Sequence, residues 1–361
     1  MANQDRDYTQ RLTELQTEIL EFVGTFESIQ EEIRPGVLPQ CQARLVSATG
    51  DTFRRFDSNF VQMTPPPDLT GTHEMLCAAI GELAKAYQLF MTTPGREWTL
   101  IYLHSRAAFC RGLYKIFDLG ERLPILAAHF LTPGANAPVH ASADGLARGF
   151  IHRKRNDERS DYSLYIPEDY SKSKPLPLIV ALHGGYGQGN EYIWTWLRPA
   201  RSRGYAVLAP KSWDVTWDMS IPSLDSQSIL RMLDQVTNEY SIDRARIYLT
   251  GLSDGGIFTF IFGFENAQLF RGLAPVAGVL HPVLDSLLRQ NRGKDTPILM
   301  IHGAQDFIFP VAFARQAFDL FKAVGYPATY EELPDWGHAY PYSINERMVL
   351  PWFESLPPKS R

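Results

Sequence analysis

The stretch Arg246-Ile-Tyr-Leu-Thr-Gly-Leu-Ser-Asp-Gly255 decides the fold of this chain. Its first half, Arg246–Thr250, is a short apolar segment that predicts a buried strand, and a helix is expected to begin near Gly255. Between them, the G-x-S-x-G pattern predicts a tight turn that holds the Ser253 hydroxyl out at the edge of a sheet. Glycine is needed at both ends of this turn because backbone segments approach there too closely for a Cβ.

The segments around this stretch alternate between strands and helices. Two segments, Phe150–Lys154 and Tyr162–Ile166, alternate in polarity as paired antiparallel strands do. Later strands are apolar on both faces, and we expect them at Pro177–His183, Tyr205–Pro210, Arg246–Thr250, Gly272–Val276, Pro297–His302 and Thr329–Leu333. Helices fit between them, including Ser226–Glu239 and Ala312–Ala323. The pattern predicts an α/β fold with a mostly parallel, doubly wound sheet.

Two residues downstream of Ser253 have the chemistry to activate its hydroxyl. A serine hydroxyl becomes a good nucleophile when a histidine takes its proton and a carboxylate orients that histidine. Asp306 and His338 each follow a predicted parallel strand, so they are expected at the same sheet edge as Ser253. The alternative acid is Asp285, in the connection after the preceding strand, in which case Asp306 would cap the next helix.

The same sheet edge is expected to carry several aromatic residues and the backbone N–H of Asp254. That N–H follows the serine and points to where negative charge would develop on a substrate oxygen. Four tryptophans in loops after strands are candidate substrate-binding residues, and ordinary packing is the alternative for each: Trp194, Trp213, Trp217 and Trp336. His183 and His302 each end a core strand, and we expect both to be structural.

The first part of the chain has a helical period. Seven apolar residues recur at spacings of three and four: Leu12, Leu15, Ile19, Phe22, Phe26, Ile29 and Ile33. Further stripes follow, so we expect an all-α helical bundle over residues 1–131, a linker over 132–147 and the α/β domain over 148–361. The first stripe fits an intramolecular bundle or the seam of a homodimer, and the bundle is favoured because the neighbouring helices also need a partner.

Composition excludes several classes of protein. The net charge is −5, with no basic face that would indicate a nucleic-acid partner. No stretch is long and apolar enough to span a bilayer, and the polar N-terminus is unlike a secretory signal. Cys41, Cys77 and Cys110 lie far apart and fit neither a disulfide framework nor a metal site. We therefore expect a cytoplasmic protein without a metal.

Three stretches resemble the α/β-hydrolase superfamily. They are Leu182-His-Gly-Gly-Tyr-Gly187, Gly251-Leu-Ser-Asp-Gly-Gly256 and the pair Gly303-Ala-Gln-Asp306 with Gly337-His338. In detail they are most similar to the carboxylesterase and phospholipase group. The segment Asp243-Arg-Ala-Arg-Ile-Tyr248 also resembles feruloyl esterases, polyhydroxybutyrate depolymerases and prolyl-oligopeptidase-type peptidases. The resemblance covers about Gly149 to Leu356, and the N-terminal bundle lies outside it.

The resemblance implies roles for individual residues. Ser253 would be the nucleophile, His338 the base and Asp306 the acid that orients it. A second oxyanion donor would follow His183-Gly184, so it would be the backbone N–H of Gly185 or of Tyr186, acting together with that of Asp254. No cofactor is implied.

The function expected from these residues is hydrolysis of a small-molecule carboxylic ester through an acyl-enzyme. The same groups could also serve a prolyl-oligopeptidase-type peptidase, or a hydrolase of thioesters, lactones or carbon–carbon bonds. A third alternative is a partner-binding helical module on a vestigial hydrolase scaffold. We further expect the helical domain to cover part of the site and restrict the size of the substrate.

Overall fold

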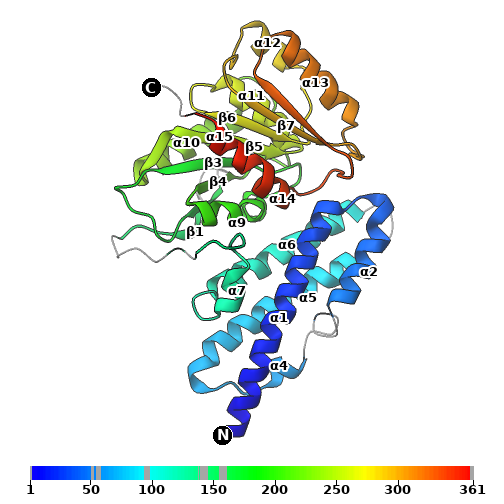
Figure 1. Ribbon diagram of the computed structural model, residues 1–361, viewed down its shortest axis with the longest axis vertical. Helices are drawn as coiled ribbons and strands as arrows, with labels where there is room; N and C mark the ends of the chain where they lie inside the picture. Colours follow the sequence, from blue (N-terminus) through cyan, green and yellow to red (C-terminus); the bar gives the residue numbers. More distant parts are fainter. Residues whose placement is uncertain are drawn as a thin grey trace. The chain divides into compact units, whose positions relative to one another are not determined.

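The computed structural model describes residues 2–49, 53, 58–92, 98–136, 138, 145–153 and 161–357. The chain divides into two units, Met1–Gly134 and Ala135–Arg361, each with its own set of elements (Figure 1). The boundary falls inside the segment expected to be a linker. Among the described residues, we find no helix with the length and apolar character needed to cross a membrane.

The described residues of the first unit form helices joined by turns. Its α-helices are α1 (Ala2–Glu32), α2 (Leu38–Ala48), α4 (Ser58–Gln62), α5 (Thr70–Met91), α6 (Trp98–Asp118) and α7 (Pro124–Ala128). Short 3-10 turns at Pro35–Val37 and Pro67–Leu69 interrupt them, since proline cannot continue the preceding helix. Within residues 121–131, the chain is α-helical only over α7.

The apolar stripe of α1 is buried against other helices of the same chain. The ring of Phe22 lies 4.6 Å from that of Phe53, and the ring of Phe26 lies 4.7 Å from Phe109 of α6 and 5.5 Å from Phe90 of α5. All seven residues of the stripe are buried. The intramolecular bundle is therefore confirmed, and a homodimer seam along this stripe is wrong because the chain's own aromatic rings fill it.

The second unit contains an eight-stranded sheet of order β1-β2-β4-β3-β5-β6-β7-β8. The strands are β1 (Gly149–Arg153), β2 (Tyr162–Ile166), β3 (Leu176–Leu182), β4 (Ala206–Pro210), β5 (Ile242–Leu252), β6 (Gly272–Val276), β7 (Ile298–Gly303) and β8 (Ala328–Leu333). β1 and β2 are antiparallel to their neighbours, and the remaining pairs are parallel. The predicted α/β-hydrolase fold class is confirmed.

Helices cover both faces of this sheet (Figure 1). They are α8 (Gly189–Tyr192), α9 (Trp194–Arg203), α10 (Leu224–Glu239), α11 (Asp254–Glu265), α12 (Leu284–Arg289), α13 (Val311–Ala323), α14 (Tyr342–Ile344) and α15 (Leu350–Ser355), with a π-helical turn at Asn345–Val349. On one face, Phe353 of α15 stacks 4.4 Å from Tyr248 of β5 and 6.3 Å from Trp196 of α9. α9 and α15 therefore share that face.

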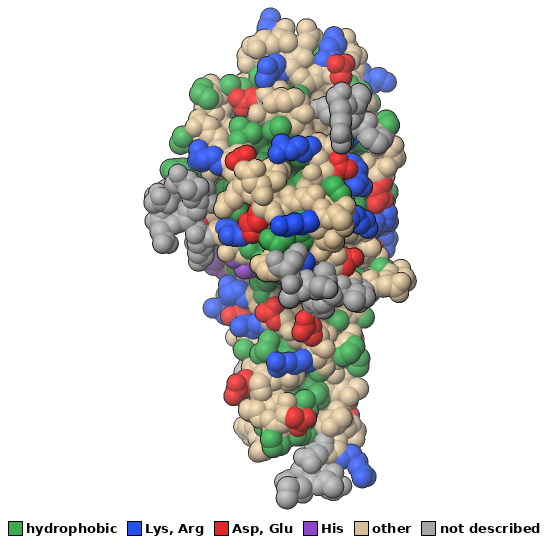
Figure 2. Space-filling view, turned by 90° about the vertical axis from the view of Figure 1, so that its left-hand side faces the viewer, with side chains coloured by type: hydrophobic (Ala, Val, Ile, Leu, Met, Phe, Trp, Pro, Cys, Tyr) green, Lys and Arg blue, Asp and Glu red, His purple; other side chains and the backbone are tan. Residues whose placement is uncertain are grey.

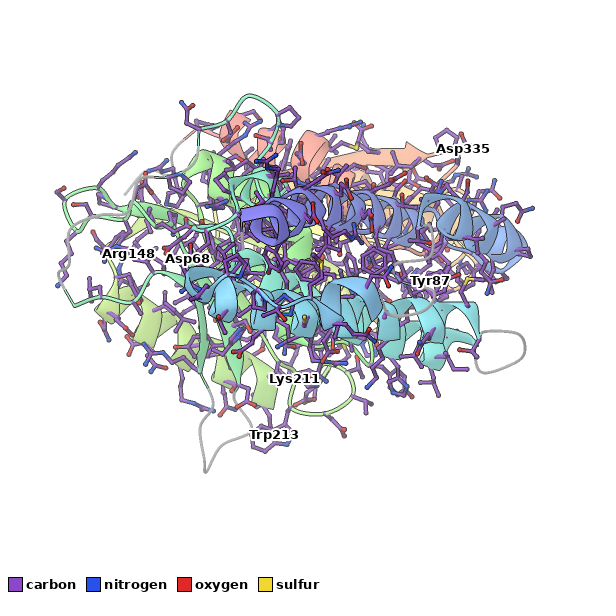
Figure 3. The ribbon with its side chains drawn as sticks, turned by 90° about the horizontal axis from the view of Figure 1, so that it is seen from below. Asp68, Tyr87, Arg148, Lys211, Trp213 and Asp335 are labelled. Carbon is purple, nitrogen blue, oxygen red and sulfur yellow. The ribbon has the colours of Figure 1, made fainter. Side chains whose placement is uncertain are left out.

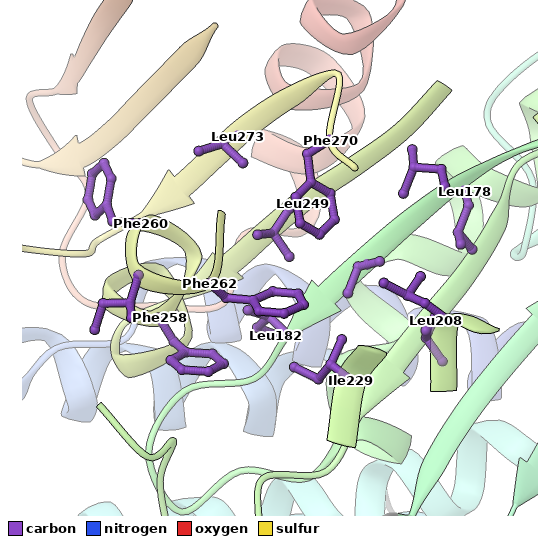
Figure 4. Close-up of a cluster of buried hydrophobic side chains, with 14 of the residues drawn as sticks. Leu178, Leu182, Leu208, Ile229, Leu249, Phe258, Phe260, Phe262, Phe270 and Leu273 are labelled. Atoms are coloured by element: carbon purple, nitrogen blue, oxygen red, sulfur yellow. The ribbon is translucent and has the colours of Figure 1, made fainter. Parts of the chain in front are cut away.

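The opposite face carries a hydrophobic core (Figure 4). Leu178 and Leu182 of β3 alternate toward it, as the two-residue period of a strand requires. They join Leu208 of β4, Leu249 of β5 and Ile229 of α10, together with the phenylalanine rows of α11. Every residue of β3 is buried, which explains why its sequence is a continuous apolar run rather than an alternating one.

Strand register brings five loops to one edge of the sheet. Leu182 pairs with Gly251, Leu252 with Val276, Val276 with Ile301, and Gly303 with Leu333. The carboxyl ends of β3, β5, β6, β7 and β8 therefore lie level with one another. The loops that follow them begin at His183, Ser253, Ala277, Ala304 and Pro334. Ligands of open α/β sheets bind at this edge.

Surface charges of both signs are interspersed on the face shown in Figure 2. Lys and Arg side chains lie beside Asp and Glu side chains over both units. Ion pairs among the described residues include Arg153–Glu239 at 2.7 Å and Arg111–Glu82 at 2.9 Å. Exposed pairs of this kind contribute at most about 1 kcal/mol each to stability, so the buried cores described above hold the fold together.

Candidate active site

Ser253 occupies a strained position at the start of α11. Its φ of 59° and ψ of −120° lie outside the regions that side-chain-bearing residues ordinarily adopt. Its N–H donates to Val276 O at 2.9 Å, and its carbonyl accepts the N–H of Ile257 at 2.9 Å. Such a conformation costs about 1–3 kcal/mol and persists only where the surroundings enforce it. The predicted strand-to-helix turn is therefore present, with Ser253 at its apex.

Two glycines make this turn feasible. A Cβ on Gly251 would lie 2.3 Å from the carbonyl oxygen of Gly255, and one on Gly255 would lie 2.4 Å from that of Leu182. Both contacts are with backbone, which cannot move aside as a flexible side chain could. The glycines of the G-x-S-x-G pattern are therefore required by close approach of β3, β5 and α11.

His338 and Asp306 form a hydrogen-bonded pair at the same edge. Nδ1 of His338 lies 2.8 Å from Oδ2 of Asp306, and the Asp306 side chain is completely buried. The other carboxylate oxygen, Oδ1, accepts the backbone N–H groups of Ile308 and Phe309 at 2.9 and 2.8 Å. With Nδ1 donating to the carboxylate, Nε2 of a neutral His338 carries the lone pair. That is the tautomer a general base needs.

Asp306 is held in its ionised form. Burial acts to raise the pKa of this carboxyl group, but hydrogen bonds from His302 and His338 and from the Phe309 N–H outweigh it. The pKa of Asp306 therefore lies well below its usual range. A carboxylate that stays charged can orient His338 and stabilise the positive charge that develops on that ring.

The alternative acid, Asp285, lies elsewhere. It is in the first turn of α12, its side chain is 72% exposed, and it pairs with Arg289 one turn later at 3.3 Å. Asp335, three residues before His338, is an exposed turn residue (Figure 3). The contact with His338 at 2.8 Å therefore supports Asp306 over Asp285 as the acid.

His183 connects the loop after β3 to the loop after β4 by hydrogen bonds. The His183 ring donates from Nδ1 to Gly184 O at 2.7 Å and accepts the Ser212 N–H at Nε2 at 3.1 Å. The indole N–H of Trp217 donates to the His183 carbonyl at 2.7 Å. Burial lowers the pKa of His183 to about 3, against the effect of its bond to Gly184. His183 is therefore a neutral, structural residue, as predicted.

Contacts between the loops after β3 and β4 also distinguish the two predicted oxyanion donors, Gly185 and Tyr186. The backbone N–H of Tyr186 donates to Val215 O at 2.6 Å, so it is already committed. This hydrogen bond disfavours Tyr186 as the oxyanion donor and leaves Gly185 as the favoured candidate after His183-Gly184. The Tyr186 side chain is 64% exposed and its φ is 59°.

Asp254 contributes a second candidate N–H and an anchoring carboxylate. As the first residue of α11, its N–H has no partner within the helix. Its Oδ2 accepts the Thr216 hydroxyl at 2.5 Å, and a Cβ placed on Gly185 would lie 2.6 Å from the same oxygen. The loops after β3 and β4 and the start of α11 therefore meet at Asp254.

The four candidate tryptophans divide by burial. Trp194 is 4% exposed and packs 4.7 Å from the ring of Phe150, while Trp217 is 2% exposed and stacks on Phe258. Both are packed as core residues, which favours the packing alternative, and their role in substrate binding stays a prediction. Trp336 is 7% exposed, immediately before Gly337-His338. Trp213 is half-buried in the loop after β4, near Lys211 (Figure 3).

Two residues contact the loops and side chains of the site, although the sequence did not assign them to it. Asp225 of α10 is 1% exposed and accepts the N–H groups of Trp213 and Asp218, both at 2.7 Å, which shapes the loop after β4. His302 contacts Asp306 directly, at 3.3 Å from Nε2 to Oδ2. The spacing His-x-x-x-Asp across a strand end is the signal that could have indicated the second contact.

The described residues contain no cluster of three or more His, Cys, Asp or Glu side chains that could hold a metal ion. Cys41 and Cys110 are buried free thiols and Cys77 is a half-buried one.

Comparison with known proteins identifies the family. The family model described as phospholipase/carboxylesterase matches residues 223–348. The bifunctional acetylxylan esterase/xylanase of Neocallimastix patriciarum is 30% identical over 162 residues, which make up 43% of this chain and 22% of that relative. Feruloyl esterase C of Emericella nidulans is 30% identical over 200 residues, which make up 52% of this chain and 69% of that relative. The chain belongs to the α/β-hydrolase superfamily and, within it, to this phospholipase and carboxylesterase family.

A solved structure described as a thermostable esterase aligns with a TM-score of 0.49 and 24% identity. The alignment covers 57% of this chain and 62% of that chain. The two relatives named above are described as esterases, and the chain spans only part of each.

Proposed function

We propose that this protein hydrolyses carboxylic esters, with Ser253 as nucleophile, His338 as general base and Asp306 as the acid that orients it. The observation that carries the proposal is the buried Asp306–His338 hydrogen bond, at the same sheet edge as a serine in strained geometry. An ionised Asp306 and a neutral His338 with its lone pair on Nε2 are the protonation states this chemistry requires.

The reaction proceeds in two halves. Ser253 Oγ attacks the ester carbonyl carbon while its proton moves to His338 Nε2, and the backbone N–H groups of Asp254 and Gly185 stabilise the oxyanion. His338 then gives this proton to the leaving alcohol as the carbon–oxygen bond breaks. In the second half, water attacks the acyl-enzyme, its proton passes to His338 and then to Ser253 Oγ, and the acid is released. The steps use only this chain's groups and water.

The substrate class is proposed from the family. Two relatives are described as an acetylxylan esterase and a feruloyl esterase, so small acyl esters of hydroxylated molecules are the first substrates to test. Near the proposed base, Phe307 and Ile308 are exposed apolar residues, and the Phe307 ring lies 6.4 Å from the His338 ring. Exposed apolar side chains beside the reacting groups favour an acyl group with apolar surface.

A fluorophosphonate probe tests the proposal because it reacts covalently with an activated serine. We expect labelling of the full chain, loss of labelling in Ser253→Ala, and no loss in the matched variant Ser286→Ala, an exposed serine of α12. Hydrolysis of p-nitrophenyl esters, compared with that of aminoacyl chromogenic amides, then separates esterase from peptidase. Faster turnover of the amides would favour the peptidase, and labelling that survives in Ser253→Ala would overturn the assignment of the nucleophile.

Location in a reducing cytoplasm and a role of the helical unit in restricting substrate size stay predictions from the sequence. The three free thiols support the first. Deletion of the helical unit, described in the Discussion, tests the second.

A further inference from the structure

A second histidine shares the carboxylate of Asp306. His302 is the penultimate residue of β7 and is 1% exposed. Its Nε2 lies 2.8 Å from the carbonyl oxygen of Phe309 and 3.3 Å from Oδ2 of Asp306. Both of these oxygens only accept hydrogen bonds, so Nε2 of His302 carries the hydrogen. The single hydrogen on Nε2 is donated to the Phe309 carbonyl at 2.8 Å and shared with Oδ2 of Asp306 at 3.3 Å, the oxygen that also accepts from His338.

The surroundings of Nδ1, the second ring nitrogen of His302, determine the charge of the His302 ring. Nδ1 is buried and has no hydrogen-bond partner among the described residues. Burying an N–H without an acceptor would cost about 1–3 kcal/mol, so the neutral ring with its hydrogen on Nε2 is favoured. His302 is therefore a neutral donor with one orientation, set by the Phe309 carbonyl and the Asp306 carboxylate.

The elements packed around this ring carry few titratable groups. In the strand pairing, His302 faces Glu332 of β8, and Glu332 is already held by Arg315 of α13 at 2.6 Å and by the Tyr330 hydroxyl at 2.9 Å. β6, on the other side of β7, has the sequence Gly-Leu-Ala-Pro-Val and carries none. α13, which packs on β7, also carries Asp319 and Lys322, and the loops after β7 and β8 carry Asp306, Asp335 and His338.

We propose that His302 is a positioning residue that fixes the Asp306 carboxylate and, by sharing Oδ2, limits how strongly Asp306 binds the protonated His338 ring. The proposal rests on the ester hydrolase function proposed above. Two donors on one oxygen divide its negative charge between them, and His302 also prevents rotation of the carboxyl group, because Nε2 ties it to the Phe309 carbonyl.

The four donors around Asp306 support this role. Oδ1 is satisfied by two backbone N–H groups and Oδ2 by the two imidazoles, which explains how a completely buried carboxylate stays ionised. Burial acts to raise the pKa of Asp306, and the contact with His302 is the first of the interactions that lower it below its usual range, which agrees with that arrangement. Without His302, Oδ2 would hold the protonated His338 more tightly, and the ring would remain protonated at a higher pH.

Two polar substitutions separate this role from a purely structural one. His302→Gln can still donate from an amide nitrogen at the place of Nε2, whereas the shorter amide of His302→Asn does not reach Oδ2. We expect His302→Asn to lower kcat by about 10- to 100-fold, with little change in KM, because the catalytic groups are displaced slightly. We also expect the acid limb of its pH–rate profile to move to higher pH. His302→Gln should stay close to the natural protein in both respects.

A buried polar residue elsewhere in the same unit controls for general destabilisation. Asn345 is completely buried and donates to the carbonyl and hydroxyl of Thr195, both at 3.2 Å. Asn345→Leu should lower the free energy of unfolding without moving the acid limb. If the acid limb does not move upward in His302→Asn, or if His302→Gln is no closer to the natural protein than His302→Asn, the proposal is overturned.

A measurement without substrate separates this proposal from the proposed function. The low-field proton resonance of the His338 Nδ1–H, identified by its loss in His338→Gln, reports the hydrogen bond to Asp306 directly. Its titration should move to higher pH in His302→Asn and not in His302→Gln. If the natural protein hydrolyses no ester but this shift is seen, the proposed function fails and the positioning role stands. If esters are hydrolysed and the titration does not shift, the positioning role fails alone.

Discussion

Nδ1 of His338 lies 2.8 Å from Oδ2 of Asp306, although the two residues are 32 positions apart in the chain and follow different strands. β7 and β8 are parallel neighbours, so the loops that follow them leave the sheet side by side. The pairing of these strands, together with two backbone N–H groups that fix the carboxylate, therefore determines which acid meets the histidine.

Replacement of Asp306 by asparagine tests this pair. The amide would present either an N–H or a weaker acceptor to His338 and would favour the wrong tautomer of the ring. We expect Asp306→Asn to lower kcat for a p-nitrophenyl ester by about 10³- to 10⁴-fold. Asp285→Asn is the matched control and should keep full activity, because Asp285 is exposed and pairs with Arg289. The opposite order of effects would make Asp285 the acid.

Replacement of a turn glycine by alanine tests the close approach at Ser253. Gly251→Ala places a Cβ 2.3 Å from a backbone oxygen, so we expect loss of stability by several kcal/mol, as for overpacking of a core, together with loss of activity. Gly24→Ala, inside α1, meets nothing within 4 Å and should stabilise the protein by about 0.5–1 kcal/mol. Urea unfolding followed by circular dichroism measures both, and equal effects of the two substitutions would contradict the account of the turn.

His183 makes stability depend on pH. In the folded chain its pKa is lowered to about 3, while an unfolded histidine has a pKa of about 6.5. Between these values the unfolded state binds more protons. The contribution of His183 to the free energy of unfolding is therefore fully present above about pH 6.5 and falls as the pH decreases toward 3. From these two pKa values, we expect this residue to account for a loss of about 2 kcal/mol between pH 7.5 and 5.

His183→Gln checks that expectation. An amide can replace part of the hydrogen bonding of the ring but does not titrate, so the variant should be less stable at neutral pH and should lose less stability on acidification. The free energy of unfolding, measured in urea at both pH values for both proteins, gives the comparison. An unchanged difference between the two pH values would mean that another group causes the loss.

Trp217 anchors the loop after β3 through one hydrogen bond. Trp217→Phe removes the donor to the His183 carbonyl and leaves that oxygen buried, which should cost about 1–3 kcal/mol in addition to the loss of ring volume. Trp336→Phe is the control, because the Trp336 indole nitrogen has no hydrogen-bond partner among the described residues. We expect Trp217→Phe to be the more destabilising of the two and to lower kcat as well, since the Gly185 N–H follows His183.

The proposed catalytic groups and the sheet core all belong to the second unit. A chain beginning at Ala135 should therefore fold and hydrolyse small p-nitrophenyl esters, with a cooperative urea transition as the check. Under the sequence-based prediction that the helical unit restricts substrate size, the shortened chain should gain rate on bulky esters relative to small ones. Unchanged selectivity in a folded, active protein would contradict that prediction.

The sequence by itself determined the parts of this protein that depend on local pattern. The apolar run of β3 predicts a strand buried on both faces, and the glycines around Ser253 predict the turn, because each is a requirement on a few neighbouring residues. The order of Ser253, Asp306 and His338 along the chain could likewise be read directly, as could the seven-residue stripe of α1.

Only the tertiary structure decided which partners these residues meet. The acid beside His338, the commitment of the Tyr186 N–H to Val215 and the contact of His302 with Asp306 depend on strands and loops that come together across the sheet. The sequence of the α1 stripe fits packing within a bundle or across a dimer. In the structure, Phe90 and Phe109 of the same chain pack against it. Periodicity shows that a face is apolar, but hydrophobic burial has no direction of its own, and only the packed chain selects the surface that covers it.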